Sequence, residues 1–184
     1  MIYYHGTPAM GLKCLEAAKP VLFDKPAKVY LTTLYPMALL YGIKNYEYTY
    51  GYTREKRIYF SEYFPNALET LYRGKTASVY ICSPEATEPG RIPNEFVSEK
   101  NVKILEEIRI PDVCEALLEQ ERLGNITIQR YWQLPQQELA WIRKVEKEGI
   151  IKSDLIHNPS PMADYYRTYY PDSWEDAKRE QALK

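Results

Sequence analysis

Short apolar runs alternate with polar stretches along the first two thirds of the chain, and their lengths predict strands. The runs at residues 77–82 and 101–110 are rich in β-branched and other apolar side chains, as strand interiors are. Shorter runs of the same kind lie at residues 2–4, 28–32 and 58–60. Gly6 follows the first run and is expected to end it.

Apolar residues spaced three or four apart predict helices between and after these strands. Thr7 followed by Pro8 is typical of a helix start, so a helix is expected over residues 8–18. Pro36 opens a second helix, which includes Tyr41. Further helices are expected at residues 66–73, 111–123 and 135–148, each followed by a glycine, and after the capping-box pattern Ser173-x-x-Asp176.

The two parts of the chain differ in character, which predicts one domain followed by an extension. Residues 1–124 combine strands with helices and are expected to form an α+β domain. Residues 125–184 are expected to form a helical C-terminal extension packed on it. Residues 83–93 contain three prolines and are expected to be a loop, and residues 159–171 are rich in Tyr and Pro.

Composition narrows the class of protein. The 184 residues include 24 basic and 25 acidic ones, so the net charge of −1 provides no overall positive field for nucleic acid or anionic lipid. No apolar run is long enough to cross a membrane, and the N-terminal residues lack the pattern of a signal peptide. We therefore expect a cytoplasmic protein with no membrane partner.

The cysteines and histidines predict no bound metal. Cys14, Cys82 and Cys114 are widely spaced and form no C-x-x-C pair, which favours a reducing compartment over a disulfide framework. His5 and His157 lie far apart, and neither has a second ligand at metal-binding spacing.

Tyrosine is unusually frequent, with 18 residues against 4 phenylalanines. Its ring is large and apolar and its hydroxyl is polar, so tyrosine serves both cores and binding surfaces. A Tyr-rich tail contains Tyr165, Tyr166, Tyr169 and Tyr170 beside Arg167. Two interpretations of this tail stay open: a surface that binds a partner, and a core edge that packs the extension onto the first domain.

Three segments stand out as candidates for chemistry. They are Tyr4-His5-Gly6-Thr7 at the end of a strand, the strand residues Val29-Tyr30 followed by Tyr41 in a helix, and Asn94-Glu95-Phe96-Val97 before a late strand. Each alone has a structural explanation, because a histidine near a strand end, a glycine in a turn or a tyrosine in a core is common in any fold.

As an ordered set, the three segments resemble the ADP-ribosyltransferase fold. The resemblance is to its His–Tyr–Glu branch, which contains the poly(ADP-ribose) polymerases and diphtheria toxin. The branch has a His-Gly-Ser/Thr motif, a strand Tyr followed by a helix Tyr, and an Asn-Glu-Tyr-hydrophobe motif. These are matched by His5-Gly6-Thr7, by Tyr30 with Tyr41 eleven positions later, and by Asn94-Glu95-Phe96-Val97. The run from Tyr30 to Gly42 is also similar to the bacterial rifampin ADP-ribosyltransferases, and the resemblance covers about residues 2–110.

The resemblance implies a split β-sheet core with flanking helices and an enzyme that moves ADP-ribose from NAD to an acceptor, releasing nicotinamide. Cleavage of NAD develops positive charge on the ribose, which a nearby carboxylate stabilises in the transition state. By the resemblance, Glu95 has this role. Tyr30 and Tyr41 would sandwich the nicotinamide ring, the Gly6 backbone would bind its amide, His5 would bind a ribose hydroxyl, and Thr7 completes the cofactor-binding motif.

Departures from the family leave the third catalytic residue open. The interval from Tyr30 to Glu95 is longer than in the rifampin enzymes, which use an acidic residue soon after the strand matching residues 77–82. By that comparison Glu88 is an alternative, and Glu99 is another because it lies closer to the strand at 101–110. A cation for the pyrophosphate is expected from the basic cluster Arg54, Lys56 and Arg57.

Other functions stay open beside the transferase. An inactive member of the fold would serve as an interaction module through the Tyr-rich tail. A second relative of the fold moves an RNA 2′-phosphate to NAD, although the near-neutral charge argues against an RNA partner. The acceptor is a protein side chain, a nucleic acid or a small molecule, and a short transferase of this kind also suits a toxin.

Overall fold

A computed structural model describes residues 1–17 and 27–183 of the chain. The chain folds into two compact units, each with most of its packing inside itself. The N-terminal unit comprises Met1–Phe60 and Leu68–Ile128, and the C-terminal unit comprises Ser61–Ala67 and Gln129–Lys184. The segment Ser61–Ala67 thus groups with residues far along the chain. A single division of the sequence into an N-terminal and a C-terminal part does not reproduce these units.

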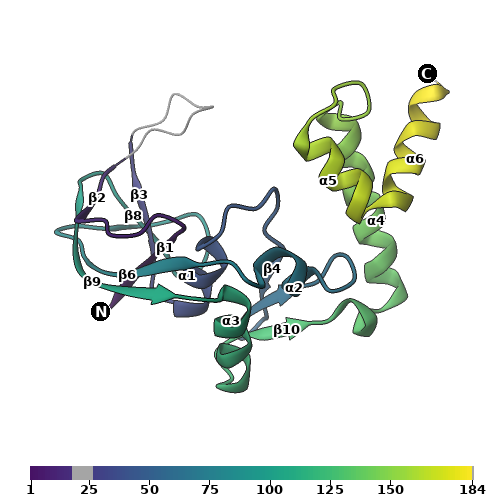
Figure 1. The fold of residues 1–184 in the computed structure, drawn as a ribbon. Helices are drawn as coiled ribbons and strands as arrows, with labels where there is room; N and C mark the ends of the chain where they lie inside the picture. The colour runs from purple at the N-terminus through teal and green to yellow at the C-terminus, as the bar shows by residue number, and fades with distance from the viewer. Residues whose placement is uncertain (18–26, 184) are drawn as a thin grey trace. The chain divides into compact units, whose positions relative to one another are not determined.

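The described residues form a mixed α+β fold with six α-helices and a seven-stranded sheet, and the α+β class expected from the sequence is confirmed. The strand order is β2-β9-β6-β1-β3-β8-β7, and every recorded pairing is antiparallel. Figure 1 labels all of these strands except β7. The strands are β1 (Tyr3–Thr7), β2 (Cys14–Leu15), β3 (Val29–Thr32), β6 (Ala77–Ser83), β7 (Glu88–Pro89), β8 (Glu95–Ser98) and β9 (Val102–Ile110).

Strand β6 is deeply buried within the sheet. Strand β6 lies between β9 and β1, and its Val79 and Tyr80 are both fully buried. A strand that is covered on both faces has a nearly continuous apolar sequence, because its side chains are buried on each side. For this reason residues 77–82 are easily identified as a strand from the sequence. One core cluster joins this strand to its neighbours through Leu15, Val29, Leu31, Tyr80, Cys82 and Val102.

Strands β1 and β3 pair at a single position, and there the sheet divides. Strand β1 pairs with β6 along its length, from Tyr3↔Cys82 to Thr7↔Ser78. Toward β3 the described pairing is limited to Tyr4↔Thr32. Within residues 1–17 and 27–183, the edge of β1 beyond Tyr4 therefore has no strand partner on that side.

Helix α1 (Tyr35–Tyr41) lies against β1 and approaches it very closely. Pro36 is in its first turn, where a missing N–H costs nothing, and the residues from Pro36 to Leu40 are buried. A Cβ on Gly6 would lie 1.7 Å from the carbonyl oxygen of Ala38. Only glycine fits at this position, because any side chain would overlap the helix backbone.

A second, three-stranded sheet has the order β10-β5-β4. Its strands are β4 (Tyr50–Tyr52), β5 (Ile58–Ser61) and β10 (Thr127–Gln129). Helix α2 (Ala67–Tyr72) follows β5, and helix α3 (Val113–Arg122) precedes β10. The Asp112 side chain caps α3 by accepting from the backbone N–H of Glu115.

The C-terminal unit is helical. It contains a short 3₁₀ helix η1 (Tyr131–Gln133), α4 (Gln136–Lys152), α5 (Pro161–Tyr169) and α6 (Pro171–Ala182). Its core is a cluster of Ile150, Leu155, Ala163, Trp174 and Ala177. Helix α6 also makes two polar contacts with α4. The Ser173 hydroxyl donates to the Arg143 carbonyl at 3.1 Å, and Lys147 pairs with Glu180 at 2.9 Å.

The helix expected over residues 8–18 is wrong. Strand β1 continues through Gly6 to Thr7, and the Thr7 hydroxyl accepts from Ala9 N in a turn rather than capping a helix. Gly11 has φ +69°, and β2 then pairs with β9, so sheet pairing prevails over the helical spacing. Residue 18 lies outside the described residues.

Three other expectations differ from the structure. Helix α4 continues past Gly149 to Lys152, because α6 and α5 pack on its last turns through Ile150. Ser173 lies inside α6 rather than at its N-cap. The expected loop at residues 83–93 contains β7. The Tyr- and Pro-rich stretch, for which no element was expected, forms α5, capped by the Ser160 hydroxyl.

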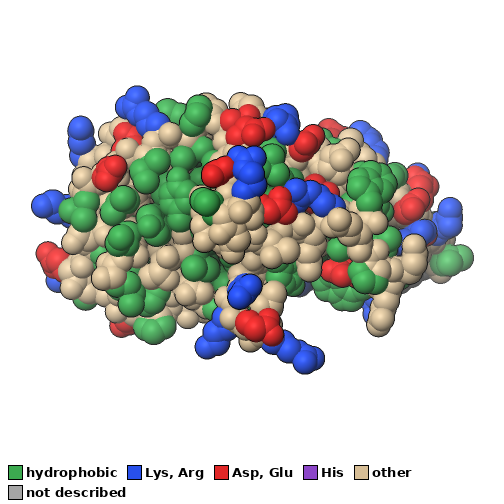
Figure 2. All heavy atoms as spheres, turned by 90° about the horizontal axis from the view of Figure 1, so that it is seen from below, with side chains coloured by type: hydrophobic (Ala, Val, Ile, Leu, Met, Phe, Trp, Pro, Cys, Tyr) green, Lys and Arg blue, Asp and Glu red, His purple; other side chains and the backbone are tan. Residues whose placement is uncertain are grey.

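The surface carries both signs of charge. On the face drawn in Figure 2, acidic and basic side chains are interspersed rather than segregated, in keeping with the net charge of −1. Among the helices of the described residues, none has the length and apolar character needed to span a bilayer.

The close approach of α1 to β1 makes a testable prediction. In Gly6→Ala the added methyl group would overlap the Ala38 carbonyl oxygen. The substitution is therefore expected to lower the free energy of unfolding by about 3 kcal/mol. Gly11→Ala is the control: Gly11 has φ +69° with open space around it, so its cost is about 1 kcal/mol. Urea denaturation measures both, and equal losses would contradict the steric explanation.

Candidate functional site

A cavity of about 350 Å³ lies in the N-terminal unit where β1 and β3 separate. Strand β1 contributes Tyr4, His5 and Gly6; β3 contributes Tyr30, Leu31 and Thr32; α1 contributes Met37, Ala38 and Tyr41; and β8 contributes Glu95. Four elements separated along the sequence thus meet around one space. We call it the split-sheet cavity.

Five of the six site residues named from the sequence line this cavity. They are His5, Gly6, Tyr30, Tyr41 and Glu95. The sixth, Thr7, is not among the lining residues, because it pairs with Ser78 at the end of β1 and its hydroxyl is engaged by Ala9 N.

The His5 imidazole is oriented by the strand opposite. Its Nδ1 lies 2.8 Å from the carbonyl oxygen of Tyr30, and a carbonyl only accepts, so Nδ1 carries the hydrogen. Burial lowers the pKa of His5, and the hydrogen bond to Tyr30 opposes this only in part. The ring is therefore neutral at pH 7 and its Nε2 is an acceptor, suited to a ligand hydroxyl.

The fold itself requires glycine at position 6. The missing side chain makes room for the backbone of α1 at Ala38. The residue still lines the cavity, and beyond Tyr4 its strand has no described pairing toward β3. The glycine therefore acts by bringing the helix and the strand together at the cavity wall.

Two tyrosine rings form part of the wall. Tyr30 is 48% exposed, which is high for a strand residue and leaves its ring accessible. Tyr41 is held from behind: its ring stacks on Tyr48 with centroids 4.6 Å apart, and its hydroxyl lies 2.8 Å from that of Tyr50. One ring is thus accessible and the other is braced by its neighbours.

The segment before Glu95 is folded around its side chain. Glu95 opens β8 opposite Thr32, and its Oε1 accepts from the backbone N–H of Arg91 at 2.8 Å. A Cβ on Gly90 would lie 2.2 Å from Oε1, so glycine is needed for this approach. Within the described residues Glu95 has no recorded ion pair, and Lys28 and Arg91 line the neighbouring cavity that it shares.

The other candidate residues lie elsewhere. Glu88 lines a neighbouring cavity of about 370 Å³ that shares Tyr30 and Glu95 with the first. Glu99 pairs with Lys28 at 3.3 Å. Neither is among the lining residues of the split-sheet cavity.

The expected pyrophosphate cations are also elsewhere. Arg54, Lys56 and Arg57 lie on the exposed turn between β4 and β5 and do not line the split-sheet cavity. Lys13 and Lys28 were not singled out from the sequence. They line a third cavity, of about 640 Å³, together with His5 and Tyr30. No local motif marks these two lysines, which directly precede β2 and β3.

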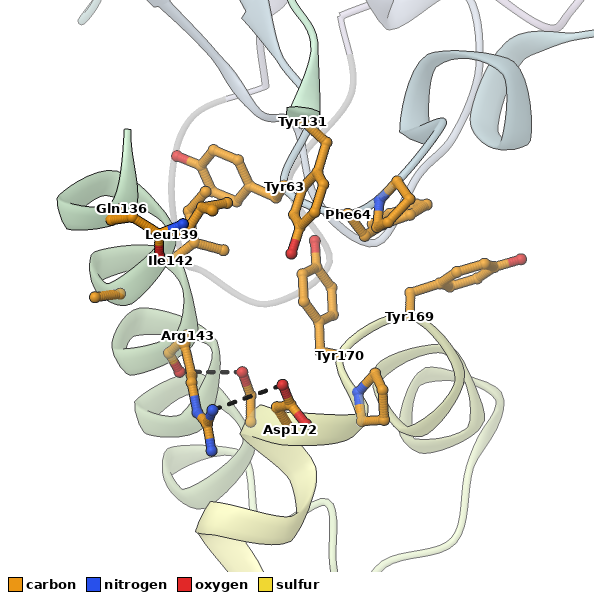
Figure 3. A pocket seen from close by; sticks show the side chains of 14 residues that line it. Tyr63, Phe64, Tyr131, Gln136, Leu139, Ile142, Arg143, Tyr169, Tyr170 and Asp172 are labelled. Carbon is orange, nitrogen blue, oxygen red and sulfur yellow. Dashed lines mark hydrogen bonds and ion pairs between the residues drawn. The ribbon is translucent and has the colours of Figure 1, made fainter. Parts of the chain in front are cut away.

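The C-terminal unit has a separate cavity of about 520 Å³ with an aromatic wall. In Figure 3, Tyr131 and Tyr170 point toward one another across it. Its cation is neutralised, because Arg143 Nε binds Asp176 at 2.6 Å and Arg143 Nη1 lies 3.6 Å from Asp172.

The Tyr-rich tail supplies much of the packing of this unit. Tyr165 and Tyr170 are buried, and the Tyr169 ring stacks on Phe64 with centroids 4.5 Å apart. Phe64 belongs to the segment Ser61–Ala67, so the tail is what joins this segment to the C-terminal helices. Its tyrosines act mainly as a core in this unit.

Comparisons of the chain with protein-family models, with curated proteins and with solved structures found no match.

The pKa of His5 predicts how stability depends on pH. In the unfolded chain the imidazole titrates near its ordinary value of 6.5, and in the folded protein it titrates below that value. Below 6.5 the unfolded state therefore binds more protons, and the contribution of His5 to stability is lost as the pH falls through the folded pKa. Urea denaturation across this range should show a steeper loss for the wild-type protein than for His5→Gln. An NMR titration that gives His5 a pKa above 6.5 would contradict the assignment.

Proposed function

We propose that the protein is an NAD-dependent ADP-ribosyltransferase. It would cleave the bond between nicotinamide and ribose and move ADP-ribose to an acceptor. The observation that supports this best is the meeting of His5, Gly6, Tyr30, Tyr41 and Glu95 at one cavity, although the chain separates them by up to ninety positions. The choice of acceptor stays open among protein, nucleic acid and small molecule.

The proposed step separates charge at the ribose. The bond from C1″ to the nicotinamide nitrogen breaks and its electron pair leaves with nicotinamide, so the ribose becomes oxocarbenium-like. A nucleophilic atom of the acceptor then bonds to C1″ and loses its proton. Glu95 has the charge to stabilise the cationic ribose, and its contact with Arg91 N orients the carboxylate in advance.

The remaining residues would bind NAD. Tyr30 and Tyr41 present aromatic rings to a planar nicotinamide, and the strand edge at Gly6 offers backbone groups for its amide. The neutral His5 can accept from a ribose hydroxyl through Nε2. A cavity of about 350 Å³ suits the nicotinamide end, and the adjoining cavity with Lys13 and Lys28 suits the pyrophosphate.

The first test is release of nicotinamide from NAD by Glu95→Gln, with NAD binding measured in the same samples. The amide oxygen of Gln can still accept from Arg91 N, so the fold should persist while the charge is lost. We expect the rate to fall by about 100-fold with binding little changed.

Glu99→Gln and Glu88→Gln are the matched controls, because each removes one carboxylate outside the split-sheet cavity. If release survives in Glu95→Gln and is lost in Glu88→Gln, the catalytic carboxylate is Glu88. Binding of NAD without release by the wild-type protein would favour an inactive binding module.

A second test concerns the exposed ring. Tyr30→Ala is expected to weaken NAD binding about tenfold, because one stacking face is lost. Stability should change little, since Tyr30 is 48% exposed. Tyr46→Ala is the control, because Tyr46 is equally exposed and does not line the cavity. Calorimetric titration with NAD measures both, and equal effects would rule out a specific role for Tyr30.

A further inference from the structure

A group of tyrosines lies behind the wall of the split-sheet cavity. Tyr41 comes from α1, Tyr48 from the following segment, and Tyr50 and Tyr52 from β4. The rings are in contact: Tyr41 meets Tyr50 edge to face at 5.9 Å, and Tyr50 meets Tyr52 edge to face at 6.3 Å. We call these four residues the tyrosine cluster.

One member of the cluster reaches the segment that carries Glu95. The Tyr52 hydroxyl donates to the carbonyl oxygen of Pro93 at 2.8 Å and also lies 3.4 Å from the sulfur of Met37. Pro93 is two residues before Glu95. The hydrogen bond therefore ties β4 to the entry of β8.

The residue between Pro93 and Glu95 has an unfavourable backbone conformation. Asn94 has φ +61°, a region that costs an L-residue free energy, although Asn tolerates it better than most. Thr33 binds it from the end of β3, with Thr33 N donating to the Asn94 carbonyl at 3.2 Å. Tyr52 holds the preceding carbonyl, so the turn into Glu95 is fixed from two sides.

The surroundings keep the Tyr52 hydroxyl protonated and able to donate. Burial raises the pKa of Tyr52 to about 12, and the nearby charge of Glu95 adds to the effect. Burial also raises the pKa of Tyr50, with a smaller contribution from Glu95. Tyr50 and Tyr52 therefore lie within electrostatic reach of the carboxylate while staying neutral at physiological pH.

We propose that Tyr52 is a positioning residue for Glu95. Its hydroxyl holds the Pro93 carbonyl, which maintains the left-handed conformation of Asn94 and so fixes the direction in which the carboxylate meets the cavity. The catalytic consequence rests on the proposed function. The structural consequence, that the Glu95 side chain is held in place, is independent of the proposed function.

Tyr52→Phe tests this, because it keeps the ring and removes only the hydroxyl. Nicotinamide release is expected to lose about tenfold in kcat with KM for NAD changed less than about twofold, since orientation and not binding is lost. Tyr48→Phe is the matched control: its hydroxyl donates to the Ile43 carbonyl at 2.9 Å, within the same cluster but away from Pro93. The proposal would be overturned if kcat fell in both variants, or if only KM changed in Tyr52→Phe.

Amide hydrogen exchange provides a readout that needs no activity. Arg91 N donates to the Glu95 carboxylate, so its exchange rate reports whether that side chain stays in place. We expect exchange at Arg91 to quicken several-fold in Tyr52→Phe and to stay at the wild-type rate in Tyr48→Phe.

The two measurements separate the two proposals. Unchanged exchange at Arg91 in Tyr52→Phe overturns the positioning role whatever the activity. Faster exchange, with no NAD cleavage by the wild-type protein, supports the positioning role and rejects the transferase. Faster exchange with an unchanged kcat shows that Tyr52 fixes Glu95 without consequence for the reaction, which overturns the catalytic part.

Discussion

The close contact between β1 and α1 is the constraint on which the candidate site depends. With glycine at position 6, the backbone of the strand lies against the Ala38 carbonyl, where even a methyl group would overlap it. The helix thereby lies beside the point where β1 leaves β3, and it carries Met37 and Tyr41 to the cavity wall. A wider spacing would separate these walls, so one missing side chain determines the shape of the site.

The walls of the cavity and its carboxylate are held in different ways. The strand and helix walls are held by sheet pairing and buried apolar packing, which are insensitive to any one polar contact. Glu95 instead enters from a turn with a left-handed residue, and individual hydrogen bonds at Pro93, Asn94 and Arg91 hold it. Precise placement of a charged group requires such bonds, because apolar packing has no directionality.

Local patterns predicted the central strands and the helices with apolar stripes, such as β6 and α1, because burial shapes their sequences directly. They failed at residues 8–17, where pairing of β2 with β9 prevails over helical spacing. They also missed that Ser61–Ala67 groups with the C-terminal helices through Phe64 and Tyr169. In both cases the partner lies more than eighty positions away in the sequence, beyond the range of any local window.

The sequence by itself determined which residue types are available, the α+β class, and a set of five residues that come to line one cavity. Only the tertiary structure decided that the missing side chain of Gly6 makes room for the backbone of α1, and that Lys13 and Lys28, not the basic cluster at Arg54, lie beside the site. It also decided which glutamate faces the cavity and that Tyr52 reaches Pro93. The reason is physical: composition and periodicity report burial, whereas strand register and the approach of one backbone to another set which side chains meet.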